Sequence, residues 1–305
     1  MSKSVAIGVD IGGTRTKYGL VDIAIGRVQK SIVLPTATAN SKVFLQQIGT
    51  VIQLLKQYAQ DNNCEVVGIG FGIPGYINEL AIIETTYGFL SFMENYPLKA
   101  IVEKEYGLPC LLDNDARVVS LGEALYGKGK NYDRVLTLTL GTGVGFGFVV
   151  NKKFAETLPL AHMGGHIKIT DEGEVCYCGK RGCLESLASA TGIITLAKHY
   201  NWSGELSAVA IFEAALNKNT IAVTIVEKLI AYLHTGIHNY VNLFAPDVIV
   251  LGGGIAKGLA PYVEKIKGQS YLAPYPGYSF ELQISELQEE AGILGSAALF
   301  QSSIL

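Results

Sequence analysis

The sequence has little charge and no strong excess of either sign. Of its 305 residues only 17% are charged, and 24 Lys and Arg against 27 Asp and Glu leave a formal net charge of -3. Proteins that bind nucleic acid or an anionic membrane through electrostatics carry a basic surplus, so neither partner is expected. The hydrophobic fraction of 49% is that of a globular chain rather than a disordered one.

Signals for export or membrane insertion are missing as well. The N-terminus, MSKSVAIGVDIGG, enters a strand pattern at once, without the apolar run and cleavage site of a signal peptide. We find no segment long and apolar enough to span a bilayer. Five cysteines, an odd number, argue against a disulfide framework and for a reducing compartment. We therefore expect a cytoplasmic α/β protein without a membrane partner.

Short apolar strands alternate with helical stretches, and the chain is long enough for two packed lobes. The stretch LTLTLGTGVGFGFVVNKKF repeats the pattern of IGVDIGGTRTKYGLVDIAIG: an apolar strand, a Gly/Thr turn and a second strand. This repetition predicts two similarly built lobes, although Gly-rich hairpins are common. We place the N-terminal lobe at 1–116 plus 290–305 and the C-terminal lobe at 117–289. Helices are predicted at 41–60, 184–200, 218–244 and 287–305.

Three glycine-rich turns each follow an apolar strand: DIGGTRT (10–16), LGTGVG (140–145) and LGGGIAKG (251–258). Glycine lets backbone N–H groups approach phosphate oxygens, and threonine hydroxyls add donors without bulk. A tight turn is the alternative for any one of them, and none matches a P-loop or a Rossmann fingerprint. Three in one chain favour nucleotide phosphate binding. The turn residues expected at the nucleotide are Gly12, Gly13, Thr14, Thr16, Gly141, Thr142, Gly143, Gly253 and Gly254.

The tripeptide DND (113–115) stands where the apolar strand LPCLL stops and a helix begins. Ligand sites of α/β sheets lie at such carboxyl ends of strands. A carboxylate there can orient and deprotonate a hydroxyl. Helix capping is the alternative, because Asp and Asn are favoured caps. Three polar residues in a row exceed what a cap requires, which favours a functional role for at least one.

The segment CYCGKRGCLE (176–185) holds three of the five cysteines. With a preceding histidine the spacing is H-x9-C-x-C-x4-C, and Gly179 and Gly182 supply turns. Four such ligands predict a closed, structural zinc site without an open position for water. Free reduced cysteines are the weaker alternative. Glu185 could face a ligand or compensate the dipole of the following helix. The predicted metal ligands are His166, Cys176, Cys178 and Cys183.

Taken together, these motifs resemble those of the ROK family (repressors, open reading frames, kinases) of the actin-like superfamily, over essentially the whole chain. DIGGTRTKYGLVD resembles the first phosphate motif, LTLGTGVGFGFVVN the second, and IVLGGG the adenosine motif. LLDNDARVVSLGEALYG resembles the sugar-binding and catalytic segment, and GGHIKITDEGEVCYCGKRGCLES the zinc signature. The resemblance implies an α/β, two-lobed actin-like (ribonuclease H-like) sugar-kinase fold with an inter-lobe active-site cleft.

The same resemblance implies ATP-dependent phosphorylation of a hexose hydroxyl, O6 of glucose, with ATP, catalytic Mg²⁺ and structural Zn²⁺. By position, it implies Asp115 as the catalytic base in contact with the sugar, and Asn114 as a ligand of a sugar hydroxyl. Asp10 is implied near the Mg·ATP phosphates. Glu185 and His166 are implied on the C1–C3 side of the ring, His166 through the nitrogen that zinc does not use. Family members are commonly oligomeric, and the predicted 218–244 helix fits a core helix or an interface, so we expect a homodimer.

Two positions depart from the family pattern. Met163 stands three residues before the zinc histidine, where a sugar-binding Glu is usual, and Arg117 stands where an Asn is usual. Both leave the sugar open, with an N-acetylhexosamine (N-acetylmannosamine type) or fructose as alternatives. Met163 also makes a catalytically weak sugar-binding sensor an alternative. A sugar-responsive repressor is a further rival, but it would carry an N-terminal helix-turn-helix, whereas the first phosphate strand begins near residue 5.

Overall fold

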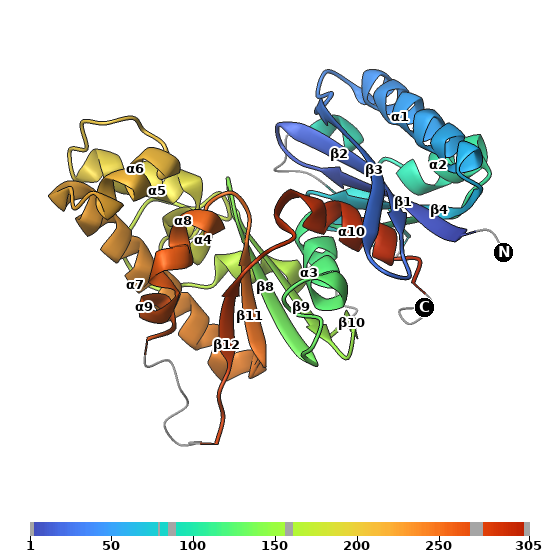
Figure 1. The fold of residues 1–305 in the computed structure, drawn as a ribbon. Coiled ribbons are helices and arrows are strands. Elements are labelled where there is room, and N and C mark those ends of the chain that lie inside the picture. Colours follow the sequence, from blue (N-terminus) through green and yellow to red (C-terminus); the bar gives the residue numbers. More distant parts are fainter. Residues whose placement is uncertain (1–2, 79, 85–89, 156–160, 269–276, 302–305) are drawn as a thin grey trace. The chain divides into compact units, whose positions relative to one another are not determined.

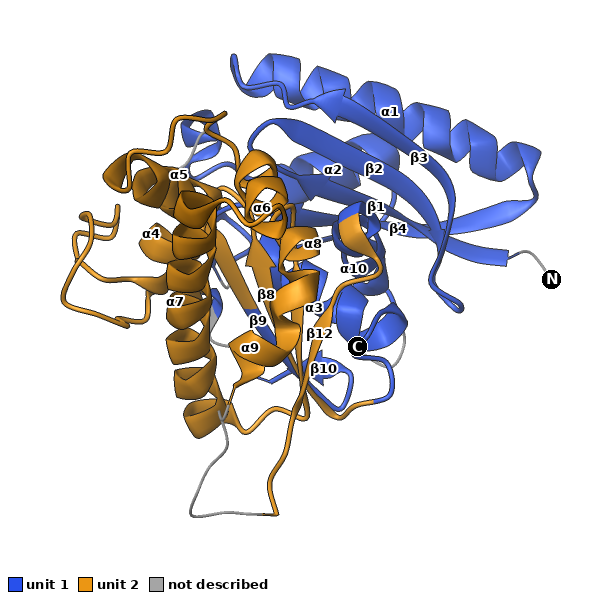
Figure 2. Ribbon diagram, turned by 60° about the vertical axis from the view of Figure 1, so that its left-hand side comes forward, with its two compact units in different colours: residues 1–131, 147–162, 289–305 blue, residues 132–146, 163–288 orange. Residues whose placement is uncertain are grey.

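The structure is a computed structural model that describes residues 3–78, 80–84, 90–155, 161–268 and 277–301 (Figure 1). The chain divides into two compact units, drawn in separate colours in Figure 2. Unit 1 comprises residues 1–131, 147–162 and 289–305, and unit 2 comprises residues 132–146 and 163–288. The lobe boundaries expected from the sequence stay a prediction.

Unit 1 is built on a five-stranded sheet. Its strands are β1 (Lys3–Ile11), β2 (Arg15–Asp22), β3 (Arg27–Pro35), β4 (Cys64–Ile73) and β7 (Cys110–Asn114). They lie in the order β3-β2-β1-β4-β7, with β1, β2 and β3 antiparallel and β1, β4 and β7 parallel. The remaining elements before residue 131 are β5 (Tyr76–Ile77), β6 (Ile83–Glu84), η1 (Ser91–Met93), α1 (Ser41–Asp61), α2 (Leu98–Tyr106) and α3 (Asp115–Tyr126).

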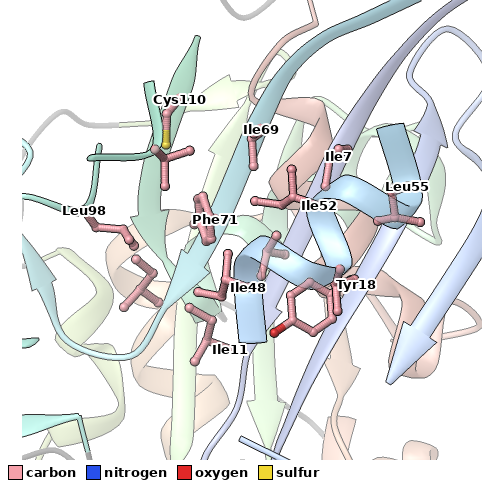
Figure 3. Close-up of a cluster of buried hydrophobic side chains, with 14 of the residues drawn as sticks. Ile7, Ile11, Tyr18, Ile48, Ile52, Leu55, Ile69, Phe71, Leu98 and Cys110 are labelled. Atoms are coloured by element: carbon pink, nitrogen blue, oxygen red, sulfur yellow. The ribbon is translucent and has the colours of Figure 1, made fainter. Parts of the chain in front are cut away.

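Helices pack on both faces of this sheet. Ile7 of β1 and Ile69 of β4 are fully buried in the cluster formed with α1, where Ile52 lies beside them (Figure 3). The next residues along the two strands, Gly8 and Gly70, lie against α10 (Ala291–Ala298). Because successive residues of a strand point to opposite faces, α1 and α10 cover opposite faces. Helix α10 is shorter than the closing helix predicted over 287–305, and the 3₁₀-helix η4 (Gln288–Glu290) precedes it. Residues 302–305 lie outside the described part.

A second five-stranded sheet has the same strand order. Its strands are β8 (Arg134–Leu140), β9 (Val144–Val150), β10 (Lys153–Phe154), β11 (Val248–Gly252) and β12 (Glu281–Ile284). They lie in the order β10-β9-β8-β11-β12. As in the first sheet, the three strands that come first in the sequence, β8, β9 and β10, are neighbours. Strand β11 then pairs in parallel with β8, and β12 pairs in parallel with β11. The Gly/Thr turns after β1 and β8 therefore occupy equivalent places, which confirms the internal repetition predicted from the sequence.

The remaining helices lie in unit 2, except that the first two residues of η2 belong to unit 1. They are η2 (Ala161–His166), α4 (Leu184–Ala188), α5 (Ala190–His199), α6 (Ala208–Leu216), α7 (Thr220–Phe244), α8 (Ala256–Leu259), η3 (Ala260–Tyr262) and α9 (Val263–Lys267). The single helix predicted over 184–200 is wrong, since α4 and α5 are separate. The break falls at Ser189, whose backbone is extended and whose hydroxyl accepts a hydrogen bond from the Gly192 N–H at 3.2 Å. Ser189 thus caps α5 and ends α4.

Helix α7 corrects a second expectation. Within the described residues it is the one helix long and apolar enough, by length and composition alone, to cross a membrane. The statement that no segment reaches this threshold is therefore wrong. Buried core helices share this composition, and α7 packs on α4, α5, α6 and α9. Its Tyr240 is fully buried, and its ring centre lies 5.2 Å from that of Phe146, with the planes tilted by 37°. The Tyr240 hydroxyl donates a hydrogen bond to the Gly164 carbonyl at 2.8 Å.

Candidate active site

Two of the predicted acidic residues lie at the same end of the first sheet, on strands separated by β4. Asp10, near the end of β1, and Asp113, near the end of β7, both lie opposite Gly72 of β4. Because the three strands are parallel, their carboxyl ends share this edge. Asp115 follows as the first residue of α3. Burial and the negative charge of Asp10 raise the pKa of Asp115 to about 6.

The three residues of DND have different roles. Asp113 accepts hydrogen bonds from Arg117 Nε and from the Asn114 N–H, each at 2.7 Å. Asn114 caps α3, because its Oδ1 accepts from two N–H groups of the first turn, at 3.0 and 3.3 Å. Its Nδ2 donates to the Gly75 carbonyl at 2.9 Å. The capping alternative therefore accounts for Asn114. The contact of Asn114 with a sugar and the role of Asp115 as the base both stay predictions.

The departure at Arg117 is accommodated by packing inside unit 1. The Arg117 side chain is almost buried, with 8% exposure, and its guanidinium carbon lies 4.3 Å from the centre of the Phe154 ring. Its ion pair with Asp113 joins the end of β7 to the first turn of α3. This pair places the backbone on either side of Asp115. The sequence analysis missed it, although the i, i+4 spacing of an acid and a base is its signal.

The first glycine turn is held from inside. The Gly12 N–H donates to the Arg15 carbonyl at 3.0 Å, and Thr36 Oγ1 donates to the Gly12 carbonyl at 2.7 Å. Gly13 and Thr14 are exposed. Thr16 is buried, and its hydroxyl lies 3.0 Å from that of Thr36. Thr16 thus stabilises the turn from its buried side. Its direct contact with a nucleotide stays a prediction.

Lys17 was not singled out in the sequence. It pairs with Asp10 in the register of β1 and β2, and its Nζ lies 3.6 Å from Asp10 Oδ2. Burial raises the pKa of Asp10, and the charge of Lys17 opposes that rise. Counting residues across the β1–β2 hairpin would have predicted this pair. Lys17 therefore favours an ionised Asp10 beside Asp115.

The second and third glycine turns lie side by side in unit 2. Strands β8 and β11 are parallel neighbours, and the Ile255 N–H beyond β11 donates to the Leu140 carbonyl at the end of β8, at 3.1 Å. Thr142 is exposed, as are Gly253 and Gly254. Two stretches more than a hundred residues apart thus present backbone at the same sheet edge. This is the arrangement expected of two turns that share one nucleotide.

The four predicted metal ligands come together. Their ligand atoms all lie within 4.8 Å of one another, with Cys176 Sγ 3.4 Å from His166 Nδ1 and Cys178 Sγ 3.6 Å from Cys183 Sγ. A tetrahedral zinc site has ligand atoms about 3.5–3.8 Å apart. Burial and the nearby charge of Lys180 lower the pKa of His166, and a neutral imidazole is the form that binds metal. The residues therefore fit a structural Zn²⁺.

Backbone hydrogen bonds build the loop that carries these ligands. The Cys176 N–H donates to the Lys180 carbonyl at 2.7 Å, and the Gly179 N–H closes a turn on the Cys176 carbonyl at 2.8 Å. Gly179 and Gly182 have φ of +86° and +76°, the left-handed region in which glycine is favoured. The turns predicted from the two glycines are thus confirmed.

Glu185 lies between the metal cluster and the second glycine turn. Its Oε2 is 4.0 Å from His166 Nε2 and accepts a hydrogen bond from the Val144 N–H at 3.4 Å. A side chain at Gly143 would approach the carboxylate to 3.2 Å, so glycine lets the turn pack on it. Burial raises the pKa of Glu185. Dipole compensation for α4 and a ligand-facing role both remain compatible with this position.

Tyr177 is a neighbour of the cluster that the sequence analysis missed. Its hydroxyl lies 2.8 Å from His166 Nε2, and the two rings meet edge to face, with centres 4.8 Å apart. His166 thus points Nδ1 at the cysteines and Nε2 at Tyr177 and Glu185. The signal that could have found Tyr177 is its place between two metal ligands.

Met163 lies on η2, three residues before His166. In a 3₁₀-helix, side chains three residues apart lie above one another, so Met163 and His166 share a face. Met163 is 36% exposed and does not fill the core of unit 2. Its contact with a sugar stays a prediction.

Comparisons with known proteins agree with these features. The model of the ROK family matches residues 6–303. The glucokinase of Halalkalibacterium halodurans is 33% identical over 98% of this chain and 96% of its own length. The crystal structure of a ROK hexokinase from Thermus thermophilus has a TM-score of 0.82 and 26% identity, covering 96% of this chain and 97% of that one. A ROK family glucokinase from Streptomyces griseus in complex with glucose and AMPPNP has a TM-score of 0.79 and 26% identity, covering 97% and 98%.

Proposed function

The chain belongs to the ROK family, and we propose that it catalyses the ATP-dependent phosphorylation of a hexose, at O6 of glucose. It has the two-lobed actin-like sugar-kinase fold of the solved ROK kinases. The observation that carries the proposal is the place of Asp115, at the carboxyl edge of the first sheet beside Asp10, with a pKa raised to about 6. A carboxylate with that pKa is ionised at neutral pH and still basic enough to accept a proton.

Asp115 acts as the general base in this proposal. It accepts the proton of the O6 hydroxyl while that oxygen attacks the γ-phosphorus of ATP. The bond from O6 to phosphorus forms, the bond from phosphorus to the β–γ bridging oxygen breaks, and ADP leaves. Positioning and electrostatics supply most of the rate in such transfers. The capped start of α3 and the Asp113–Arg117 pair hold Asp115 for this step.

The nucleotide would be bound by the three glycine turns. Their exposed members Gly13, Thr14 and Thr142 offer backbone N–H groups and hydroxyls to the phosphates. Asp10 supplies the hard carboxylate oxygen that Mg²⁺ prefers, and Lys17 favours its ionised form. When bound, Mg²⁺ neutralises the charge that develops on the phosphates.

The sugar would be bound by His166 and Glu185, which face each other across 4.0 Å. Zn²⁺ held by the four-residue cluster would fix the ring of His166, so that Nε2 points away from the metal. Glu185 accepts hydrogen bonds from sugar hydroxyls more strongly than a neutral group does. The metal is thus structural, and its neighbours are functional.

A coupled ADP-release assay over hexoses and N-acetylhexosamines tests the function. Turnover with glucose above all other sugars supports the proposal, and a preference for an N-acetylhexosamine or fructose would replace the substrate while keeping the reaction. Sugar binding without turnover would establish the sensor alternative instead. The N-acetylhexosamine alternative is favoured by Met163, because a thioether accepts hydrogen bonds weakly and offers apolar contact to an N-acetyl methyl.

Met163→Glu is expected to lower the KM for glucose by about 10–100-fold, with little change in kcat. A carboxylate on the face of η2 shared with His166 would accept hydrogen bonds from sugar hydroxyls, each contributing about 1.5–3 kcal/mol. Steady-state kinetics with glucose measures the change. Met163→Gln is the control, since it has the same shape without the charge and should give a smaller gain. An unchanged KM for every sugar would show that Met163 does not line the sugar site.

We also propose that the protein acts in the cytoplasm as a homodimer. Helix α7 places most of its apolar side chains in the core of unit 2, yet Leu243 and Ile221 remain exposed. Light scattering at micromolar concentration should give about twice the chain mass of 32.7 kDa. A mass equal to that of one chain would contradict the dimer.

A further inference from the structure

Tyr177 makes a hydrogen bond that a sugar would also need. Its hydroxyl lies 2.8 Å from His166 Nε2, the nitrogen that faces away from the cysteines. A phenol hydroxyl and a sugar hydroxyl offer the same groups to a ring nitrogen, one O–H donor and oxygen lone pairs. In the chain by itself, Tyr177 therefore stands where the proposed function places a sugar hydroxyl.

The imidazole nitrogen cannot serve both partners fully. Each ring nitrogen of histidine has a single in-plane hydrogen-bonding direction, as a donor or as an acceptor according to the tautomer. Its other nitrogen, Nδ1, is directed at Cys176 at 3.4 Å and is used there. A sugar hydroxyl that bonds to Nε2 in line must therefore displace the hydroxyl of Tyr177. Glu185, at 4.0 Å from Nε2, is not displaced by the same move and remains to hold the sugar.

The position of Tyr177 makes this displacement easy. The side chain is 59% exposed, so it can leave for solvent without opening a cavity. Its backbone stays where it is, because the flanking Cys176 and Cys178 belong to the metal cluster. Only rotation of the Tyr177 side chain is needed, and such rotations of exposed residues are fast. When no sugar is present, the edge-to-face contact of the Tyr177 ring with the imidazole, at 4.8 Å and 85°, favours the position in which the Tyr177 hydroxyl bonds to His166.

We propose that Tyr177 is an internal competitor of the sugar for His166 and thereby sets the sugar affinity. The inference rests on the proposed function, in that a hexose bonds to Nε2. It assigns Tyr177 a role in specificity as well: a sugar without the hydroxyl that meets Nε2 leaves Tyr177 in place and gains nothing from its removal. Tyr177 does not act on the reacting atoms, so its effect falls on binding and not on kcat.

Removing the hydroxyl tests the proposal. Tyr177→Phe should tighten glucose binding by about two- to tenfold, the size of one hydrogen bond between neutral partners. Isothermal titration calorimetry on the zinc-loaded chain gives the dissociation constant, and steady-state kinetics should show KM lowered and kcat unchanged. The 1-, 2- and 3-deoxy analogues of glucose locate the contact, since one of them should bind wild type and variant equally.

Tyr200→Phe is the matched control. Tyr200 lies in the same unit and meets His199 edge to face at 4.9 Å and 83°, but His199 is not one of the metal ligands. This variant should bind glucose as the wild type does. Equal zinc content and equal unfolding temperature of the two variants show that both are folded.

A spectroscopic readout keeps the test independent of turnover. In protein labelled with ¹⁵N-histidine, the Nε2 resonance of His166 should move with Tyr177→Phe in the absence of sugar and with glucose in the wild type. Unchanged or weaker glucose binding by Tyr177→Phe, or an unmoved resonance, overturns the proposal. A wild-type chain that neither binds nor phosphorylates any hexose overturns the proposed function instead, so the two failures are distinguishable.

Discussion

Asp115→Asn is expected to lower kcat by about 10²–10⁴-fold while leaving the KM for glucose largely unchanged. The amide keeps the shape of the carboxylate but cannot accept the proton of the attacking hydroxyl. The variant should be at least as stable as the wild type, because it removes the repulsion between Asp115 and Asp10 that helps raise the pKa of Asp115. Steady-state kinetics over a range of glucose and ATP concentrations, with thermal unfolding alongside, measures both effects.

The pH dependence gives the same assignment a second readout. The base must be ionised, and its pKa is raised to about 6. Activity is therefore full above that value and falls as the pH drops through about 6, with a slope of one proton. Asp61→Asn is the control, since Asp61 ends α1 and is exposed, hydrogen-bonded to Gln57. Near wild-type turnover by Asp115→Asn, or an acid limb near pH 4, would contradict Asp115 as the base.

Loss of the metal is expected to have the second large effect. The purified chain should hold one zinc, and Cys178→Ser should lose it, because three ligands bind far more weakly than a closed set of four. Structural zinc contributes strongly to the folding of its domain. We expect the free energy of unfolding of unit 2 to fall by about 3 kcal/mol or more. For a unit of this size, that lowers the unfolding temperature by roughly 6–12 °C. Elemental analysis and calorimetry measure the two quantities.

The contacts of Glu185 extend this effect beyond the metal loop. Glu185 follows the last metal ligand closely and lies against Gly143 of the second glycine turn. We therefore expect Cys178→Ser to weaken sugar binding and, to a smaller extent, ADP binding. ADP binding should not be lost, because the first glycine turn belongs to unit 1. Cys64→Ser is the control: Cys64 is a half-buried free cysteine of β4 outside the cluster. Well under one equivalent of zinc in untagged wild-type protein would refute the site.

Features with short-range causes were predictable from the sequence. The four predicted metal ligands fall within eighteen residues, so their spacing alone brings them within reach of one ion. The glycine turns can be predicted because each follows an apolar strand. The same locality predicted α1, whose apolar residues recur at helical spacing over Ser41–Asp61.

Local sequence patterns predicted less where one pattern allows two interpretations. DND allowed both capping and catalysis, and only the structure shows that Asn114 is the cap. The catalytic role of Asp115 stays a proposal. The stretch 184–200 reads as one helix by periodicity, yet the hydroxyl of Ser189 bonds to the Gly192 N–H and starts a new helix there. A serine inside a helical pattern can stay in the helix or cap it, and packing decides which.

The strand–turn repeats, the cluster of three cysteines and one histidine, and the acidic residues at strand ends were predictable from the sequence, because each depends on neighbours along the chain. The contacts between residues far apart in the chain depend on the tertiary structure. The parallel pairing of β1, β4 and β7 brings Asp10 to Asp115, and the packing of the second turn sets Gly143 on Glu185. The orientation of the His166 ring gives Nδ1 to the cysteines and Nε2 to Tyr177. Strand register and ring orientation follow from the packing of the whole unit, which no local window of sequence contains.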